Sequence, residues 1–254
     1  MQSGQGATTL TVSGFDDYLR PLPTPDRAIS LANIFLWAPV LLFSMVAHEW
    51  AHAEAAYRQG DDTAYALGRL TLNPLKHIDP FMTILLPALL LVTHSSFLFG
   101  AAKPVPVNPR NYRDYKKGDV IVSLAGIGMN LALFVACTGL FALSGVIGFS
   151  APVLQQSLAI FQQMLLLGMS FNLVLAFFNL IPIPPLDGSH VLYQLLPPQA
   201  GQRFRRLYAF GFIPIFLILA FAPVLLTPFM WPVSTLLRIG MGLVRGFALP
   251  GAAT

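Results

Sequence analysis

The chain has 254 residues, of which 55% are hydrophobic and 10% are charged. A soluble globular domain usually has about 25% charged residues, so this composition excludes an ordinary soluble protein and favours a membrane protein. The formal net charge is +4, but the lysines and arginines are scattered between apolar runs and form no basic face with interleaved aromatic residues. We therefore expect no nucleic-acid partner and attribute the positive charge to the basic bias of membrane loops.

The first thirty residues differ in composition from the rest of the chain. They are polar and contain several prolines, and they lack the basic region and short apolar core of a cleavable signal peptide. We expect three regions: a polar N-terminal arm at 1–30, a membrane-embedded core at 31–230, and an amphipathic or marginally transmembrane segment at 231–254. Cys137 is the only cysteine, which excludes an intrachain disulfide and a thiolate metal cluster.

Several apolar runs approach the length that a bilayer-spanning helix requires, about 20 residues. Five lie at roughly 31–57, 80–98, 119–147, 160–183 and 207–228. A sixth, 231–247, carries Arg238 and Arg245 on one face of a helix, so it either crosses marginally or lies in the membrane interface. The sequence therefore predicts an all-α polytopic membrane protein with about five to six transmembrane helices.

Two connections, 59–79 and 100–118, are rich in residues that interrupt helices. The second contains three prolines within six residues, and proline both fixes its own φ and disfavours the helical region in the residue before it. Irregular backbone at membrane depth is tolerated only where it is buried in protein or lines a wet cavity. We expect both connections to be looped, extended or re-entrant segments around a buried site.

A metal-binding pattern stands inside the first apolar run. His48-Glu49-Trp50-Ala51-His52 has the H-E-x-x-H spacing, which places both imidazoles on one face of a helix, about 40° apart. Glu49 can then lie beside a zinc ion without ligating it and act as a general base. A structural histidine pair is the alternative, but ionisable groups inside an apolar helix are costly and usually serve a function.

A catalytic zinc site needs a third protein ligand and one open position. Asp187 is the candidate, because it follows a segment in which three prolines interrupt the fourth apolar run. The alternative for Asp187 is a helix-terminal carboxylate in a loop. If it is a ligand, His48, His52 and Asp187 form the zinc-binding triad.

These segments resemble the site-2 protease family of intramembrane zinc metalloproteases. HEWAH and NLIPIPPLDG (179–188) are similar to the two signatures of that family, and three further segments are similar to its compact prokaryotic members without a PDZ or CBS domain: GRLTLNPLKHIDP (68–80), FGAAKPVPVNPRNY (99–112) and SLAGIGMN (123–130). The resemblance implies zinc bound by His48, His52 and Asp187, and Glu49 as the general base. It also implies that Asn179 assists the reacting carbonyl.

The expected substrate is a membrane protein with a transmembrane segment, which must unwind before its amides can be cleaved. Extended segments at 68–74 and 103–109 are suited to pair with it by strand addition, so Asn73 and Pro104 are candidate substrate-binding residues. Asn130 is a third candidate, although an asparagine on an apolar helix is more often an inter-helix hydrogen-bond partner. Besides the lipid bilayer, we expect either a regulatory partner that is not identified by the sequence or a second copy of the chain.

The expected reaction is hydrolysis by a zinc-activated water, with Glu49 accepting its proton. One alternative is a non-enzymatic membrane protein that binds or transports zinc with the same ligands. A second alternative is a membrane peptidase that trims soluble peptides.

The zinc ligands also constrain the topology. His48 and His52 lie late in the first apolar run and Asp187 follows the fourth, so these two helices must be parallel. One intervening run must then fail to cross, and 80–98 is the best candidate because Pro87 lies near its middle. The 148–159 loop has no Lys or Arg, so the positive-inside rule predicts a zinc site that opens toward the cytosol of a prokaryotic cell, in a multi-pass protein of its membrane.

Overall fold

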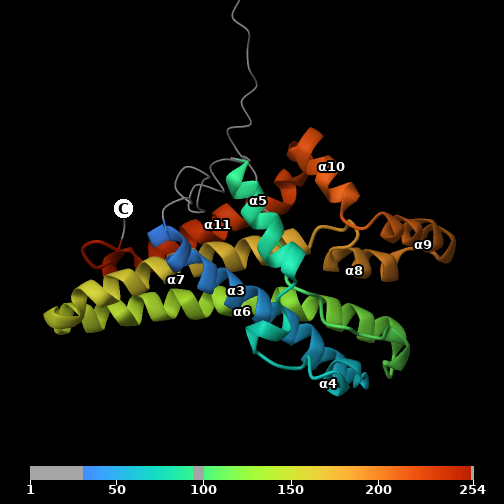
Figure 1. Cartoon of the computed structure of the whole chain (residues 1–254), viewed down its shortest axis with the longest axis horizontal. Helices are drawn as coiled ribbons and strands as arrows, with labels where there is room; N and C mark the ends of the chain where they lie inside the picture. The colour runs from blue at the N-terminus through green and yellow to red at the C-terminus, as the bar shows by residue number, and fades with distance from the viewer. Residues whose placement is uncertain (1–30, 94–99, 253–254) are drawn as a thin grey trace, which may run out of the picture.

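The computed structural model describes residues 31–93 and 100–252, and in these ranges it is helical without any β-strand (Figure 1). The expected all-α fold is confirmed. The proposed N-terminal arm at 1–30 lies outside the described residues. Four long helices form the body of the molecule: α3 (Leu31–Gln59), α6 (Tyr115–Ser150), α7 (Gln155–Asn179) and α11 (Thr227–Val244).

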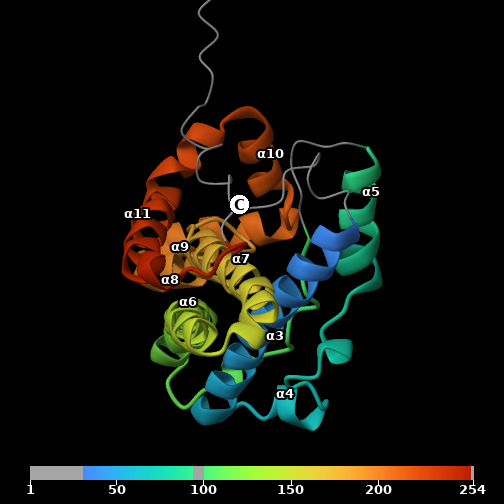
Figure 2. The ribbon, with the colours of Figure 1, turned by 90° about the vertical axis from the view of Figure 1, so that its left-hand side faces the viewer.

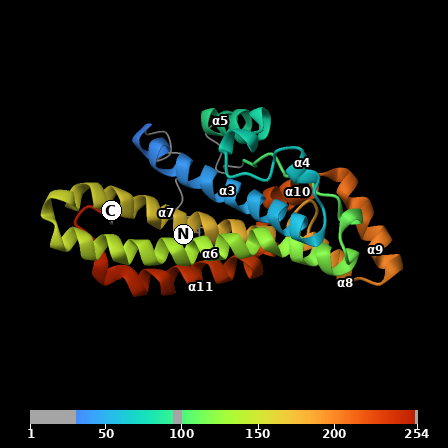
Figure 3. The same cartoon turned by 90° about the horizontal axis from the view of Figure 1, so that it is seen from below.

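Helices α6 and α7 form a long antiparallel hairpin, and the other two long helices pack against it on different sides (Figures 2 and 3). Helix α3 contacts both members of the hairpin, whereas α11 packs mainly against α7. Buried apolar side chains fill the contact between α7 and α11, where Leu173 of α7 packs against Met230 and Val233 of α11. Helices α3 and α7 run in the same direction and α6 runs in the opposite one (Figures 1 and 3).

Three helical segments of the described chain are long and apolar enough to cross a membrane: Tyr115–Ser150, Pro152–Asn179 and Pro223–Phe247. The bent pair Pro198–Phe210 and Ile213–Phe221, with an angle of 82° between its parts, would make a fourth if it is one broken span. The first of these segments has 36 residues, or about 54 Å at 1.5 Å per residue, which exceeds the ~30 Å hydrocarbon core of a bilayer.

The C-terminal third differs from the expected helix boundaries. The prediction of a single apolar run over 207–228 is wrong. The chain forms a 3₁₀ turn, Arg206–Phe210, then α10 (Ile213–Phe221), then a second 3₁₀ turn, Pro223–Leu226. Gly211 has φ +54° between the first two elements, a conformation that glycine adopts without steric cost. The run at 231–247 belongs to a longer helical segment that begins at Pro223, one of the three long apolar segments of the described chain.

The connection between α3 and α6 leaves and returns at the same end of α3. Its start and finish are joined by a hydrogen bond from the Arg113 N–H to the Gln59 carbonyl, 2.8 Å. Between them lie several short helices: α4 (Thr63–Ala66), 3₁₀ turns at Pro74–Lys76 and Pro109–Asn111, a π-helical turn at Pro80–Leu85, and α5 (Leu86–Val92). The rest of its described residues have no regular structure, as expected.

A buried carboxylate holds the two irregular parts of this connection together. Asp61 is fully buried and accepts hydrogen bonds from the Thr63 N–H (3.2 Å) and hydroxyl (2.5 Å), the Asn108 N–H (2.6 Å) and the Asn111 amide (2.9 Å). Burial acts to raise the pKa of Asp61, but the hydrogen bonds from Thr63, Asn108 and Asn111 outweigh it and lower the pKa below its usual value. The side chain is therefore an anion that both segments fold around.

We expect Asp61→Asn to loosen both segments, because an amide places N–H donors where the carboxylate accepts them and leaves buried donors without partners. Trypsin should then cut after Arg69 or Arg110 faster than in the wild type. Asp62→Asn is the matched control, since the neighbouring Asp62 side chain makes no capping hydrogen bond. Equal cleavage rates in the two variants would contradict the role of Asp61.

Candidate metal centre

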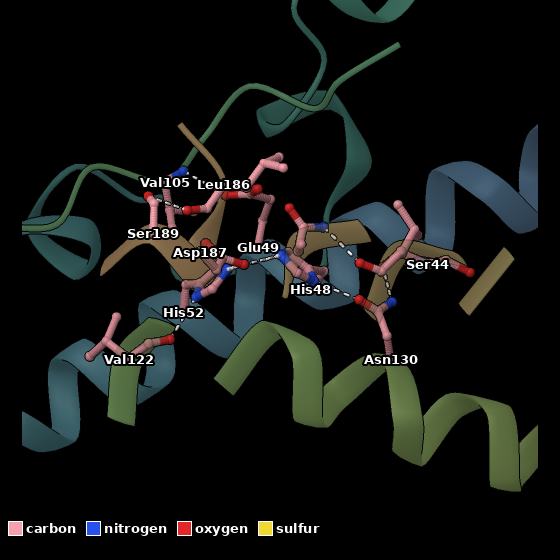
Figure 4. A network of polar contacts seen from close by, with 12 residues as sticks. Ser44, His48, Glu49, His52, Val105, Val122, Asn130, Leu186, Asp187 and Ser189 are labelled. Carbon is pink, nitrogen blue, oxygen red and sulfur yellow. Dashed lines mark hydrogen bonds and ion pairs between the residues drawn. The ribbon is translucent and has the colours of Figure 1, made fainter. Parts of the chain in front are cut away.

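Three candidate ligand atoms from two parts of the chain lie close together. His48 and His52 project from one face of α3, and Asp187 is the first residue of α8 (Asp187–Leu195). Their atoms form a triangle: His48 Nε2 to His52 Nε2 is 3.0 Å, His48 Nε2 to Asp187 Oδ2 is 3.1 Å, and His52 Nε2 to Asp187 Oδ2 is 3.3 Å (Figure 4). In the described chain this is the one group of three such side chains that could hold a metal ion.

The size of this triangle fits a zinc ion. Ligand atoms placed tetrahedrally at ~2.0–2.1 Å from zinc lie about 3.3–3.4 Å from one another, so the three sides are only slightly short. Both histidines are more than nine-tenths buried, and two imidazoles with one carboxylate form a ligand set that catalytic zinc sites use. The residues present therefore fit the metal.

Hydrogen bonds behind the ligands turn both imidazoles so that Nε2 faces the centre. His52 Nδ1 donates to the Val122 carbonyl at 2.7 Å, and His48 Nδ1 donates to Asn130 Oδ1 at 2.5 Å. Partners of this kind fix the tautomer and the ring orientation of a metal-binding histidine. Both come from α6, so the packing of α3 against α6 sets the geometry of two ligands.

The orientation of Asn130 is fixed in turn by a buried polar chain across three helices. The Asn130 amide nitrogen donates to Asn172 Oδ1 on α7 at 2.8 Å, and the Asn172 nitrogen donates to Ser44 Oγ on α3 at 3.0 Å. Since the Asn130 nitrogen is used in this way, its oxygen faces His48. The three polar side chains are buried to at least 98%, and each of them finds a partner.

A glycine allows α6 to approach the ligands. A Cβ atom at Gly126 would lie 2.5 Å from His52 Nε2 and 2.6 Å from His48 Nε2, which is closer than any real contact. The residue at this position can therefore have no side chain while the two imidazoles keep their places.

The broken end of α7 places Asp187. The helix ends at Asn179, and the segment 180–186, which contains Pro182, Pro184 and Pro185, turns the chain before α8 begins. Gly188 packs against the Leu180 carbonyl so closely that any Cβ would collide with it. The carboxylate is thereby presented to the histidines from the first turn of a new helix.

Glu49 lies beside the three ligand atoms without joining them. Its Oε2 accepts a hydrogen bond of 2.8 Å from the backbone N–H of Val105 (Figure 4). Glu49, His48, His52 and Asp187 together line a cavity of about 410 Å³. This cavity is the space in which a substrate could reach the metal and the carboxylate together.

The remaining candidate residues occupy different places. Asn179 lines the cavity, and its amide nitrogen donates to the Leu175 carbonyl of its own helix at 2.9 Å. Pro104 also lines the cavity. Asn130 is fully buried behind His48, and Asn73 accepts from the Leu75 N–H as the cap of a 3₁₀ turn. Neither Asn130 nor Asn73 belongs to the cavity wall.

Sequence reasoning missed a second polar group on the cavity wall. Asp119 of α6 is 5% exposed, accepts from the Gln194 amide at 2.6 Å and faces His190 Nδ1 at 3.4 Å. His190 also lies edge-on to the Tyr208 ring, with ring centroids 5.3 Å apart. The feature of the sequence that could have indicated this group is Asp119 itself, because it is an acidic residue at the start of an apolar run.

Comparisons with known proteins identify the family of the chain. Residues 37–221 match peptidase family M50. "Putative zinc metalloprotease YwhC" of Bacillus subtilis (strain 168) is 41% identical over 76% of this chain and 82% of the relative. "Putative zinc metalloprotease Rip2" of Mycolicibacterium smegmatis (strain ATCC 700084 / mc(2)155) is 29% identical over 76% of this chain and 70% of the relative. No solved structure matches the chain. By the family match and these relatives, the chain belongs to peptidase family M50, the site-2 protease family, and is a zinc metalloprotease.

Proposed function

We propose that this protein is an intramembrane metalloprotease that hydrolyses peptide bonds of membrane-protein substrates, with zinc held by His48, His52 and Asp187 and with Glu49 as the general base. The observation that carries the proposal is the triangle of ligand atoms with sides of 3.0–3.3 Å at the wall of the same cavity as Glu49. Structural histidines would not require a convergent carboxylate and an open cavity beside them.

Each residue has a separate task in the proposed reaction. A zinc ion held by these three residues would act as a Lewis acid. It would polarise a carbonyl and make water a better nucleophile. Glu49 takes the proton from the attacking water and returns it to the leaving amine. Asn179 lines the cavity and has a second amide N–H beyond the one that bonds Leu175, and in the proposed reaction this donor stabilises the oxyanion. Asn130 holds His48 in its binding orientation rather than contacting substrate.

We expect the purified protein to contain one zinc ion per chain, and replacing His48, His52 or Asp187 by Ala to remove it, because each residue supplies one bond. Glu49→Gln should keep the zinc and lose peptide hydrolysis, since the amide cannot accept a proton. Elemental analysis and mass spectrometry of cleavage products in proteoliposomes would measure both quantities.

The same pair of measurements separates the protease from its alternative. A zinc transporter needs no general base, so Glu49→Gln would leave zinc transport intact and the wild type would yield no peptide products. Full zinc content in Asp187→Ala would remove that residue from the triad. Equal cleavage of a substrate and of a version lacking its transmembrane segment would favour the trimming of soluble peptides.

We expect Asn179→Ala to reduce turnover by about 10²–10³-fold, the usual effect of removing one oxyanion donor, while zinc content stays close to that of the wild type. The comparison of kcat with zinc per chain tests this assignment. Gln156→Ala is a suitable control, because Gln156 is exposed in the first turn of the same helix and lies off the cavity wall. An unchanged kcat in Asn179→Ala would reduce the residue to a cap of α7.

The proposed topology places the zinc site at the cytosolic side, with 80–98 re-entrant between two crossing segments. Three features support it. Helices α3 and α7 are parallel, and the Arg113–Gln59 hydrogen bond closes the intervening connection at one end of α3. Within 80–98, the described helical part is Pro80–Val92, which is about 20 Å long at 1.5 Å per residue. This length is too short to cross the hydrocarbon core of a bilayer. With the membrane core at 31–230 and the C-terminal segment crossing, five of the six candidate runs remain as spans once 80–98 is re-entrant.

The charge distribution supports the same orientation. The end of the molecule that holds the start of α6 and α9 (Pro198–Arg205) carries Arg113, Lys116, Lys117, Arg203 and Arg205, whereas the turn at 148–159 between α6 and α7 has no Lys or Arg and Arg245 lies after α11 toward that other end (Figure 3). The positive-inside rule assigns the first end to the cytosol of a prokaryotic cell. The expected partners are the bilayer, a substrate with a transmembrane segment, and either a regulatory protein or a second copy of the chain.

Cysteine labelling in a Cys137→Ser background tests the topology. We expect Lys76→Cys and Lys116→Cys to react with an impermeant reagent from the cytosolic face, because the connection returns to the side from which it leaves. Val153→Cys, in the exposed turn between α6 and α7, should react from the opposite face. Labelling of positions 76 and 116 from opposite faces would exclude the re-entrant arrangement.

A further inference from the structure

Residues 104–106, which pack on α3 and line the cavity with Pro104 and Val105, have one backbone N–H donor among them. In Pro104-Val105-Pro106, both prolines lack an N–H, so Val105 provides the one backbone donor of three consecutive residues. Proline also favours extended backbone in the residue before it, and these residues have no regular secondary structure. The sequence therefore isolates a single N–H on an extended stretch.

This N–H points at the proposed general base. Val105 N lies 2.8 Å from Glu49 Oε2, which is a charge-assisted hydrogen bond when Glu49 is ionised. The Val105 side chain is 8% exposed and packs with Ala53, one turn beyond Glu49 on α3, and with Ala64 of α4. The backbone donor is thus fixed against the helix that carries the carboxylate.

Hydrogen bonds on both sides hold the segment in place. The Lys103 N–H donates to the His77 carbonyl at 2.7 Å, and the Asn108 N–H donates to the buried Asp61 carboxylate at 2.6 Å. Pro104 and Val105 line the cavity and leave about 410 Å³ open. The segment is therefore a wall of the site, and the N–H of Val105 remains on Glu49 while the cavity is open.

We propose that the backbone N–H of Val105 is a positioning group for Glu49, which it reaches from the Pro104-Val105-Pro106 segment. The bond occupies one carboxylate oxygen and stops the side chain from rotating, so that the other oxygen faces the water whose proton it accepts. The flanking prolines offer no competing donor that could draw the carboxylate away. This inference rests on the proposed role of Glu49 as general base.

The kinetic test compares two changes at the same residue. Val105→Pro deletes the N–H that binds Glu49 and keeps a ring of similar volume against Ala53. Val105→Ala keeps this N–H and loses more of the side chain, so it controls for the change in packing. The probe is a synthetic transmembrane peptide of about 20 Leu and Ala residues with a central Gly-Pro break and a fluorophore–quencher pair, in proteoliposomes.

Val105→Pro should have a kcat at least about tenfold below that of Val105→Ala, because general-base catalysis contributes about 10²–10⁴-fold and depends on the position of the base. KM and zinc per chain should be alike in the two variants. If the wild type holds zinc and cuts the peptide while the two variants have the same kcat, this inference is wrong and the proposed function stands. A wild type without zinc and without cleavage overturns the proposed function and the inference with it.

Hydrogen exchange tests the contact without activity or metal. In residues 104–107 only Val105 and Val107 have an exchangeable backbone N–H, so mass spectrometry of a peptide over this segment counts these amides directly. Glu49→Ala should make one amide exchange about tenfold faster or more, the effect of losing a hydrogen bond to a charged group. Glu54→Ala is the control, because Glu54 pairs with Arg58 at 2.8 Å on the outer side of the same helix. Unchanged exchange in Glu49→Ala would overturn the proposed contact.

Discussion

The close approach of α3 and α6 at Gly126 is the contact on which the rest of the site depends. With no side chain at this position, α6 comes near enough for the Val122 carbonyl and Asn130 to accept from the outer nitrogens of His52 and His48. The inner nitrogens are then left facing Asp187. A methyl group on α6 would displace both imidazoles at once, so one packing contact controls two of the three ligand positions.

Polar groups in the helix contacts around the site are costly unless each finds a partner, and here they find one another. Asn130 and Asn172 would be unfavourable singly on apolar helices, but together with Ser44 they form a continuous chain that ends on His48. Asp61 shows the same principle in the connection between α3 and α6, where one buried carboxylate satisfies donors from two loops. The chain of Ser44, Asn172 and Asn130 fixes the orientation of His48, and the Asp61 carboxylate fixes the shape of the connection.

Local patterns in the sequence predicted the parts of the site that depend on local structure. The spacing of His48 and His52 required only a helix, and the prolines before Asp187 showed where the fourth apolar run is interrupted. The pairing of Asp119 with His190 could not be derived, because it depends on the contact between α6 and α8. Asn130 was expected as a possible substrate contact, but only the packing of α3 on α6 places it behind a ligand. The break at Gly211 was missed because an apolar composition does not reveal a positive φ.

The hydrogen bond between Arg113 and Gln59 closes the connection between α3 and α6 at its base. It ties the end of α3 to the start of α6, so the helices that carry His48, His52 and Asn130 are joined at their base whatever lies between them. Lengthening a connection whose ends are already held together costs little entropy. Relatives could therefore insert or remove residues around α5 to suit other substrates while the candidate metal ligands keep their positions and Ala64 and His77 keep their contacts with residues 103–105, which makes this part of the connection the natural place for specificity to diverge.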